Sequence, residues 1–543
     1  MSANDARWEI RQTLRARNFE PDLHDAERYI GDLKVGHQTV RVSIEVRDLS
    51  FCALPRVHIQ DRGSVSWDVL AHTQSETGIC YGLKGFYSLD PAQPGAAIVR
   101  VLEDSAKTLL RSSKGRGPNE VAQEYAAYWG GPDYAIYSAR PWSSKMNSFE
   151  RLSTANGPRF LLAEAGTKVP AGYSRLKPRF CVIEISATAR PARGILVPMT
   201  LSQLLDWLEA LEGTGSIRRS VIEAVADGMG ILIAAENGNY GAFFDLPTSL
   251  TRIKNPRRRF LIDQISKSAN EVGLTQIRGT PCDLESITMR SLPRNTKTLS
   301  DFSVCLVGCG AIGGHLVRLL CQLGAGSKKS LTIIDPDTLK SGNVGRHALG
   351  FSYIDRPKAA AMAEELLKLH PDISVVAIQA QATDLRANIM RHDIIVDATG
   401  VENVSCLLNH WFREQGAPVS KKALFHSFLF GHGVAAQSFA NLGNEFACFR
   451  CLRPSRNETW RHDPRKSDAQ NDQPLDTGCG DGAFLPYGPY AGTAAASLTA
   501  QHIHEWIQGV RRHTLRTLII DSERGKHVKP NTPPKVPDCP GCA

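Results

Sequence analysis

The chain has 543 residues, a formal net charge of +9 and 13 cysteines. A charge this mild fits an acidic partner or a nucleotide without requiring nucleic acid. The lack of a leader peptide and of a run of roughly 18 apolar residues argues against a secreted or membrane protein. Length predicts about three domains, and the cysteines suit thiol chemistry and metal binding in a reducing cytosol, so we expect a cytoplasmic α/β multidomain protein with no nucleic acid or membrane partner.

The first third of the chain combines helix-like and strand-like patterns. An amphipathic pattern begins at Trp8, and apolar and polar residues alternate over residues 38–46. The elements expected next are a strand at residues 57–59, a helix at residues 95–111 and a helix that ends at Trp129. The mixture predicts an α+β domain over residues 1–146.

Cys80 follows Gly78 in a polar stretch of this domain. A glycine leaves the backbone open beside the cysteine, and polar neighbours keep a thiol within reach, which suits a reacting cysteine. The alternative is a structural cysteine in an ordinary strand. Cys52, between Phe51 and Ala53, is interpreted as a core residue.

Residues 147–298 carry little functional signal. We expect strands at residues 160–163, 179–185 and 230–234 and a helix at residues 201–211. A basic patch at residues 252–259 is better explained by a solvated turn than by a nucleic-acid contact. Because no glycine fingerprint occurs here, we expect an α/β scaffold and dimerisation surface.

The most specific pattern lies in the last domain, residues 299–543. A strand-like run enters a turn that contains Gly308, Gly310 and Gly313, and a second apolar run ends at Asp335. In such a turn one glycine makes the bend, one lets phosphate approach the backbone, and one lets the next helix pack on the sheet. An acidic residue about 20 positions later binds a ribose. The context predicts a Rossmann-like nucleotide site.

Two cations follow the second strand of this pattern. Asn343, Arg346 and Lys358 come after Asp335 and Asp337. A hydride-transfer enzyme has no evident need for these two cations, whereas cleavage of ATP between its α- and β-phosphates builds charge that they would stabilise. The plainer alternative is a pair of solvated surface charges.

This series of residues resembles the ThiF/MoeB/ubiquitin-activating superfamily, whose pattern runs from a glycine turn through an acidic strand end to Asn-x-x-Arg and a later lysine. The resemblance implies that Asp335 binds the ATP ribose. It implies that Asn343 and Arg346 bind the phosphates and that Lys358 binds the leaving or α-phosphate.

One departure from the superfamily pattern concerns the metal. The superfamily carries a Mg²⁺-binding aspartate where this chain has Gly400. The resemblance therefore implies that Asp397 or Glu402 takes over the metal. The alternative for Asp397 is the capping of a strand end.

Four cysteines form two CxxC pairs, Cys448 with Cys451 and Cys539 with Cys542. Each pair presents two thiolates to one metal, so the two pairs predict a closed, structural Zn²⁺ site that fastens the C-terminal segment to the domain. A redox pair or a chance match is the alternative for a single CxxC. ThiF and MoeB proteins carry this arrangement in matching places.

Cys479 follows a long polar segment, residues 452–478, and is flanked by glycines. Such a segment cannot be buried, and a cysteine at its end can travel to capture an acyl-adenylate. In ubiquitin-activating and sulfur-carrier relatives the cysteine that receives the C-terminus of the carrier lies here, which implies that role for Cys479. The alternative is a small buried residue.

The first domain resembles the bacterial branch of ubiquitin-conjugating domains, in which a Leu-Pro strand leads to Gly-x-Cys and a later helix ends in Tyr-Trp. On this resemblance Cys80 is the transthiolation cysteine, and the middle region is a linker or a degenerate adenylation-like domain. The implied activity is a relay with ATP, Mg²⁺ and Zn²⁺ as cofactors. A protein C-terminus is adenylated, forms a thioester at Cys479, moves to Cys80 and is conjugated to a target lysine.

Fused proteins of this kind resemble those of CBASS anti-phage operons, which implies a cGAS-like nucleotidyltransferase or a ubiquitin-like protein as the substrate. The superfamily also implies a homodimer in which one subunit lends an arginine, for which Arg278, Arg290 and Arg294 are candidates. Two alternatives stay open. One is a sulfur-carrier adenylyltransferase of thiamin or molybdopterin type, in which Cys80 has no purpose, and the other is a binding module with a degenerate ATP site.

Overall fold

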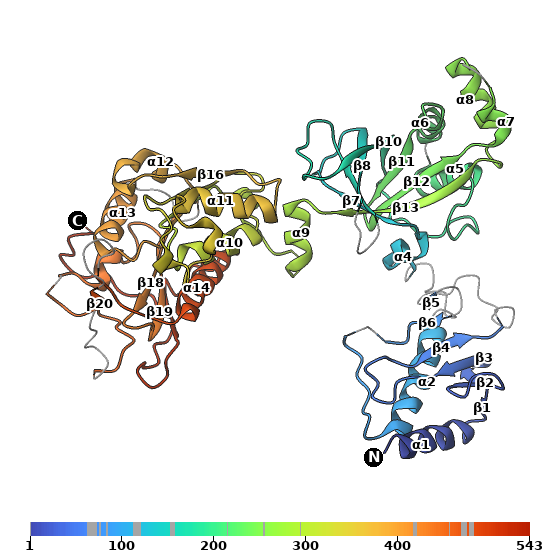
Figure 1. Cartoon of the computed structure of the whole chain (residues 1–543), viewed down its shortest axis with the longest axis horizontal. Coiled ribbons are helices and arrows are strands. Elements are labelled where there is room, and N and C mark those ends of the chain that lie inside the picture. Colours follow the sequence, from blue (N-terminus) through green and yellow to red (C-terminus); the bar gives the residue numbers. More distant parts are fainter. Residues whose placement is uncertain are drawn as a thin grey trace. The chain divides into compact units, whose positions relative to one another are not determined.

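The computed structural model divides the chain into two compact units, which we describe separately (Figure 1). The first unit comprises Met1–Thr167 and Gly172–Thr280, and the second comprises Lys168–Ala171 and Pro281–Ala543. The residues that the structure describes are 2–61, 73–74, 78–82, 85–111, 121–138, 140–152, 158–213, 215–253, 256–293, 295–415, 421–455, 457–467, 475–476 and 483–542.

The first unit begins with an antiparallel sheet and two helices. The sheet has the strand order β1-β2-β3-β4-β6-β5. Its elements are α1 (Ala3–Arg15), β1 (Glu20–Pro21), β2 (Arg28–Val35), β3 (Gln38–Glu45), β4 (Arg56–Ile59), β5 (Thr73–Gln74), β6 (Gly78–Ile79) and α2 (Pro94–Arg111). Ile10 and Leu14 of α1 and Ile98 of α2 are buried in one core with the sheet, while Trp8 of α1 is 65% exposed. The expected amphipathic helix and alternating strand are confirmed.

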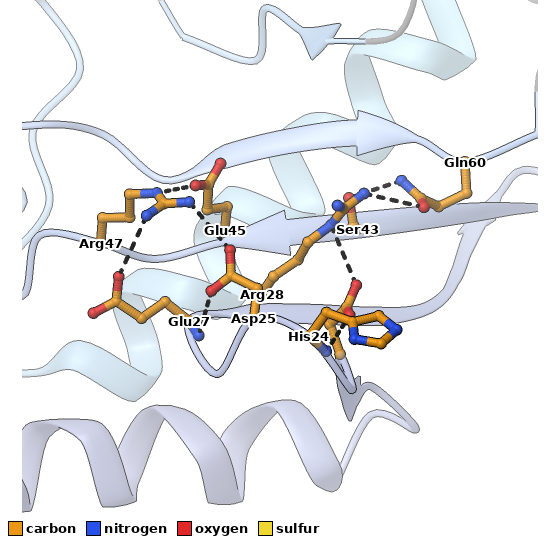
Figure 2. Close-up of polar contacts among 9 residues, drawn as sticks. His24, Asp25, Glu27, Arg28, Ser43, Glu45, Arg47 and Gln60 are labelled. Carbon is orange, nitrogen blue, oxygen red and sulfur yellow. Dashed lines mark hydrogen bonds and ion pairs between the residues drawn. The ribbon is translucent and has the colours of Figure 1, made fainter.

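Polar side chains connect the strands of this sheet at its surface (Figure 2). Arg47 forms ion pairs with Asp25 at 3.1 Å and with Glu27 at 4.0 Å, and Arg28 donates to Gln60 at 3.2 Å. These groups are in contact with solvent, where such pairs contribute little to stability. The sheet therefore depends on its buried apolar core.

The rest of the first unit is a closed barrel with the strand order β10-β11-β12-β13-β7-β9-β8. Its strands are β7 (Asp133–Ile136), β8 (Lys145–Arg151), β9 (Arg159–Ala163), β10 (Ser174–Glu184), β11 (Gly230–Ala235), β12 (Gly238–Asp245) and β13 (Gly273–Pro281). The helices are α4 (Tyr125–Trp129), α5 (Leu201–Glu212), α6 (Gly215–Ala226), α7 (Thr248–Thr251) and α8 (Arg258–Lys267). The strands and the helix expected in the middle region are confirmed, and Trp129 and Trp207 lie in the core.

The second unit contains a seven-stranded sheet with the order β16-β15-β14-β17-β18-β19-β22. Its first five strands run parallel and the last two pairings are antiparallel. The strands are β14 (Val304–Val307), β15 (Leu331–Ile334), β16 (Val375–Ile378), β17 (Ile394–Asp397), β18 (Ala423–Phe430), β19 (Ala435–Asn441) and β22 (Leu515–Ile519). From β14 the chain passes to β15, which pairs with one edge of β14. Strand β17 pairs with the other edge of β14. This reversal of strand order opens a crevice at the carboxyl ends of the strands.

Helices and short turns complete the second unit. They are α9 (Leu284–Ser291), α10 (Gly313–Gln322), α11 (Lys358–Leu369), α12 (Arg386–Met390), α13 (Glu402–Glu414) and α14 (Pro489–Ile507), with the 3-10 turns η3 (Leu299–Asp301), η4 (Ser341–Asn343), η5 (Phe351–Tyr353), η6 (Ala382–Asp384) and η7 (Phe449–Leu452). Strand β20 (Leu475–Asp476) pairs antiparallel with β21 (Ala483–Phe484). Among the described residues, no helix is both long and apolar enough to cross a bilayer.

The interpretation of Cys52 as a core residue is wrong, because its side chain is exposed. Asp48 accepts hydrogen bonds from the backbone N–H groups of Ser50 at 2.9 Å and Ala53 at 2.7 Å, which folds the segment into a turn. Phe51, with a φ of +55°, is buried instead of Cys52.

Candidate active site

The glycine turn after β14 needs its glycines for the three reasons expected from the sequence. Gly308 has a φ of +89°, which a side chain would disfavour. A Cβ on Gly313 would lie 1.9 Å from the carbonyl oxygen of Gly308, so only glycine lets α10 begin this close to the turn. A Cβ on Gly310 would meet nothing within 4 Å, which leaves its backbone open to a ligand.

A cavity of about 400 Å³ lies at the carboxyl ends of β14, β15 and β17. Of the residues predicted to bind the nucleotide, it is lined by Gly308, Gly310, Asp335, Asp337 and Lys358. Tyr487, just before α14, also lines it. Parallel strands bring these residues together because their carboxyl ends meet at one edge of the sheet.

Asp335 is buried and already holds the glycine turn. Its Oδ2 accepts a hydrogen bond from the backbone N–H of Cys309 at 2.6 Å, and its Oδ1 accepts one from Asp337 at 2.9 Å. A carboxylate has further lone pairs, so the expected ribose contact is compatible with these bonds. The carboxylate thus fixes the shape of the turn and also faces the cavity.

His347, for which no role was predicted, supports the same turn from the other side. Its Nε2 donates to the carbonyl oxygen of Cys309 at 2.6 Å, and its Nδ1 accepts from the backbone N–H of Leu349 at 3.0 Å. Burial lowers the pKa of His347, which favours the neutral ring that this pattern requires. Cys309 is therefore held at its N–H by Asp335 and at its carbonyl by His347.

The predicted cation Lys358 points into the cavity. Only 10% of its side chain is exposed, and its Nζ lies 2.9 Å from Oδ2 of Asp337, whose side chain is 64% exposed. Asn343 accepts from the backbone N–H of Lys340 at 3.2 Å. Arg346 donates to the carbonyl oxygen of Gly342 at 3.1 Å. Neither Asn343 nor Arg346 belongs to the cavity wall.

Asp397 lies at the end of β17 and is fully enclosed. Its Oδ1 accepts from the N–H and hydroxyl of Thr399, and its Oδ2 accepts from Ser405 and from Nδ1 of His426 at 2.8 Å. Burial acts to raise the pKa of Asp397, but the hydrogen bonds from His426, Ser405 and Thr399 hold it below its usual range. These four bonds fill its acceptor positions and do not fit direct coordination of Mg²⁺. Through these bonds Asp397 holds in place the turn that leads from β17 to Gly400.

A second cavity of about 250 Å³ adjoins the first. Gly400, with a φ of +67°, lines both cavities. Glu402 lines the second cavity and forms an ion pair with Arg453 at 2.8 Å. Glu402, the second residue predicted to bind Mg²⁺, is thus already paired with an arginine.

The four cysteines of the two CxxC pairs come together as predicted. Their sulfur atoms all lie within 4.8 Å of one another, with 3.9 Å between Cys448 and Cys451, 3.8 Å between Cys448 and Cys539, and 3.4 Å between Cys451 and Cys542. A tetrahedral Zn²⁺ with bonds of about 2.3 Å places its sulfur ligands about 3.8 Å apart. A Cβ on Gly541 would lie 2.9 Å from the sulfur of Cys448. The cluster therefore has the spacing of a Zn²⁺ site.

The two predicted transfer cysteines lie in different parts of the chain. Cys80 directly follows β6 and is partly exposed, and Tyr81 beside it donates to the carbonyl oxygen of Pro55 at 2.5 Å. Across the sheet from Gly78 lies His58, and burial lowers its pKa. Cys479 lies outside the described residues.

The arginines expected to serve a partner subunit have separate environments. Arg278 of β13 pairs with Asp133 at 3.0 Å, Arg290 is exposed in α9, and Arg294 lies outside the described residues. The basic patch at residues 252–259 includes Arg258, whose guanidinium pairs with Asp227 at 2.7 Å. That arginine has a structural partner.

Two family descriptions match the chain. Residues 286–541 match the ThiF family, and residues 5–133 match Prokaryotic E2 family B. The "ATP-dependent ubiquitin transferase-like protein Cap2" of Pseudomonas aeruginosa (strain BWHPSA011 / Pa011) is 27% identical over 91% of this chain and 90% of its own length. The protein of the same name from Escherichia coli (strain TW11681) is 30% identical over 48% of this chain and 44% of its own length.

Among solved structures, that of E. coli MccB with ATP covers 55% of this chain and 77% of its own. It is 18% identical, with a TM-score of 0.35.

Proposed function

This chain combines a ThiF domain with a prokaryotic E2 family B domain, and we propose that the two domains activate a protein C-terminus with ATP and conjugate it to target amines. One observation carries the proposal. The glycine turn, Asp335 and Lys358 meet in one cavity of a chain whose E2 domain also presents the partly exposed Cys80. The name of the P. aeruginosa relative, which matches nearly the whole chain, supports the same activity.

The first step is adenylation in the cavity beside β14. Asp335 binds the ribose, and the backbone at Gly310 binds phosphate. An oxygen of the donor carboxylate forms a bond to the α-phosphorus, while the bond from that phosphorus to the bridging oxygen breaks and pyrophosphate leaves. Lys358, with Asn343 and Arg346 at the margin, stabilises the charge that develops. Asp337 offers Mg²⁺ the more exposed carboxylate, and the ion would neutralise phosphate charge when bound.

Two cysteines then carry the acyl group. The thiolate of Cys479 attacks the acyl carbon, and AMP leaves with the electrons of the acyl–oxygen bond. The chain that follows Cys479 soon reaches Tyr487 in the wall of the nucleotide cavity, which supports this assignment. The thiolate of Cys80 next displaces that of Cys479, and a lysine amine of the target displaces Cys80 and loses a proton. Fusion of both cysteines in one chain raises the effective concentration of the second step.

The four-cysteine cluster fits Zn²⁺ by its sulfur spacing, and the ion would join η7 to the segment around Cys539 when bound. We propose a homodimer in the cytoplasm that takes a cGAS-like nucleotidyltransferase or a ubiquitin-like protein as its donor in anti-phage defence. A sulfur-carrier adenylyltransferase would have no use for the E2 domain, so that alternative is not favoured.

The test is the intact mass of the Cys80→Ser protein co-expressed with the proteins encoded beside its gene, because an ester on serine outlives a thioester. We expect a hydroxide-labile adduct whose mass equals that of one neighbour. A Lys358→Ala change in the same protein should abolish it, and a Cys52→Ser change should not. An adduct that survives loss of Lys358, or no adduct at serine, would overturn the relay.

A further inference from the structure

The barrel of the first unit has an irregular pairing between two neighbouring strands. Strands β8 and β10 pair antiparallel, and Leu176 of β10 lies opposite Ser148 (Figure 1). The next pairing joins Phe180 to Met146, so β10 advances four residues where β8 advances two. The additional residues form a bulge, and bulges redirect the side chains of a strand.

A cavity of about 680 Å³ lies at this bulge and is lined by four basic residues, Lys145, Arg175, Lys177 and Arg179. All four are exposed. The turn between α6 and β11 completes the lining with Asp227, Gly228 and Met229, and Leu176 of β10 adds an apolar side chain. The bulge thus gathers several cations around one hollow of the surface.

The positive charge of this cavity has little compensation. Asp227 is the only carboxylate among the lining residues that the structure describes. It already accepts two hydrogen bonds from the guanidinium of Arg258, at 2.7 and 3.1 Å, which hold the pKa of Asp227 below its usual range. Within the described part of the chain, no ion pair joins a carboxylate to the other cations, Lys145, Arg175, Lys177 and Arg179. The cavity therefore retains a net positive charge.

This arrangement favours an anionic ligand. Like charges on neighbouring strands repel one another and destabilise a sheet. A ligand with several negative charges would replace that repulsion by attraction, and it would be drawn to the cavity from a distance.

The lining favours a peptide over a nucleic acid. None of the described lining residues is aromatic, whereas single-stranded nucleic acids bind largely by stacking on aromatic rings. Leu176 and Met229 offer apolar contacts, and a methionine side chain adapts to the shape of its partner. Arg175 and Arg179 can bind carboxylates through their guanidinium groups. Carboxylates beside an apolar side chain match this combination.

We propose that the cavity between the bulge of β10 and the turn after α6 is a docking site for an acidic segment of a partner protein. Its carboxylates would bind the four basic side chains, and an apolar residue would contact Leu176 and Met229. The inference does not depend on adenylation, since neither the glycine turn nor Lys358 lines this cavity. It gives the barrel, for which a scaffold and dimerisation surface was predicted, a role in the recognition of a protein.

The test is the fluorescence anisotropy of a labelled twelve-residue peptide of Asp, Glu and Leu with the full chain. The comparison probes, of equal length, are a peptide of Asn, Gln and Leu and an oligothymidylate. We expect the acidic peptide to bind at least about tenfold more tightly than either, and its affinity to fall as salt rises. Equal binding of the neutral peptide, tighter binding of the oligonucleotide or no binding of the acidic peptide would overturn the inference.

Charge reversal locates the binding. Lys145→Glu combined with Arg179→Glu should weaken binding of the acidic peptide at least about tenfold. Arg219→Glu combined with Arg252→Glu is the matched control, because both arginines are exposed and lie outside the lining. An equal loss of affinity in the control would indicate a general attraction to the basic chain and would overturn the inference.

Folding and catalysis are followed in the same samples. Both double variants should keep the melting temperature and the ATP–pyrophosphate exchange of the unchanged chain, because the substituted side chains are exposed and remote from the nucleotide residues in sequence. Lys177→Glu alone is the milder variant if the cavity pair lowers stability, and it should also weaken binding of the acidic peptide. Unchanged affinity in Lys177→Glu and in the cavity pair would overturn the inference.

Discussion

The nucleotide cavity and the four-cysteine cluster belong to the same unit but are completed differently. In the cavity, Asp335 and His347 already hold the glycine turn through bonds to Cys309. In the cluster, the thiols of the two CxxC pairs lie against one another, and four adjacent thiolates, three of them buried, require a cation. The cavity is held in shape by its own residues before a ligand binds, whereas the cluster stabilises the fold fully only when it binds an ion. Four experiments test this difference, from the largest expected effect to the smallest.

Disruption of the cluster should have the largest effect. Cys451→Ser removes one of four ligands from a site whose occupation contributes about 10–16 kcal/mol in other small zinc domains, so the melting temperature should fall by about 10 °C or more. Thermal melts by circular dichroism, with the zinc content of each sample, provide the measurement. Cys52→Ser, at an exposed cysteine, is the control. Equal melting temperatures for the two variants, or after chelation, would show that the cluster stands without a metal.

Gly313→Ala tests whether the nucleotide cavity is as rigid as its contacts indicate. The added Cβ would lie 1.9 Å from a backbone oxygen, and overpacking of this kind costs about 1–3 kcal/mol or more. We expect lower thermal stability and loss of ATP binding by calorimetry. Gly310→Ala is the paired variant, because its Cβ enters open space: stability should persist while ATP affinity falls. If both variants bind ATP normally, the turn does not hold phosphate.

His347 should make the cavity sensitive to acid. Because burial lowers its pKa in the folded protein, the unfolded chain binds more protons just below pH 6.5, and the contribution of His347 to stability is lost as the pH falls below that value. His347→Gln should retain ATP binding better than His347→Ala, since an amide can donate to Cys309, and should reduce the slope of melting temperature against pH. An unchanged slope would show that His347 does not cause the sensitivity of the cavity to acid.

Lys358→Ala should have the smallest effect on stability and a large one on activity. Its partner Asp337 is mostly exposed, and such ion pairs contribute under about 1 kcal/mol. Pyrophosphate exchange should nevertheless be lost, because the cation faces the cavity. Urea unfolding and exchange assays on the same samples give the two values. A large loss of stability would mean that Lys358 is a structural residue.

The cysteine cluster and the glycine turn could be predicted from sequence because their signals are local. Each CxxC pair brings two ligands together within one turn, and Gly308, Gly310 and Gly313 lie within a few residues. The parallel sheet follows from short apolar runs separated by helical segments. These patterns need no knowledge of distant contacts.

Other residues were missed because their partners are remote. His347 acts on Cys309, and Tyr487 reaches the cavity from the start of α14, and no spacing rule connects them to the turn. The four bonds to Asp397 come from three residues, including His426 on the next strand. The wrong interpretation of Cys52 has a local cause. Its neighbours Phe51 and Ala53 are apolar and indicate a core position, whereas the hydrogen bonds to Asp48 fold the segment into a turn.

The distance in sequence between the cysteine pairs sets an order of events during synthesis. Cys448 and Cys539 are 91 positions apart, although their sulfur atoms nearly touch. Ribosomes add about 5–20 residues per second, so the first pair waits roughly 5–20 seconds for the second. During that interval only two of the four thiols of the cluster, those of Cys448 and Cys451 at η7, have been synthesised. Its ring Phe449, which packs on His426 with 4.3 Å between centroids, lies between the two waiting cysteines. The four-cysteine cluster therefore cannot close until the segment around Cys539 has been synthesised.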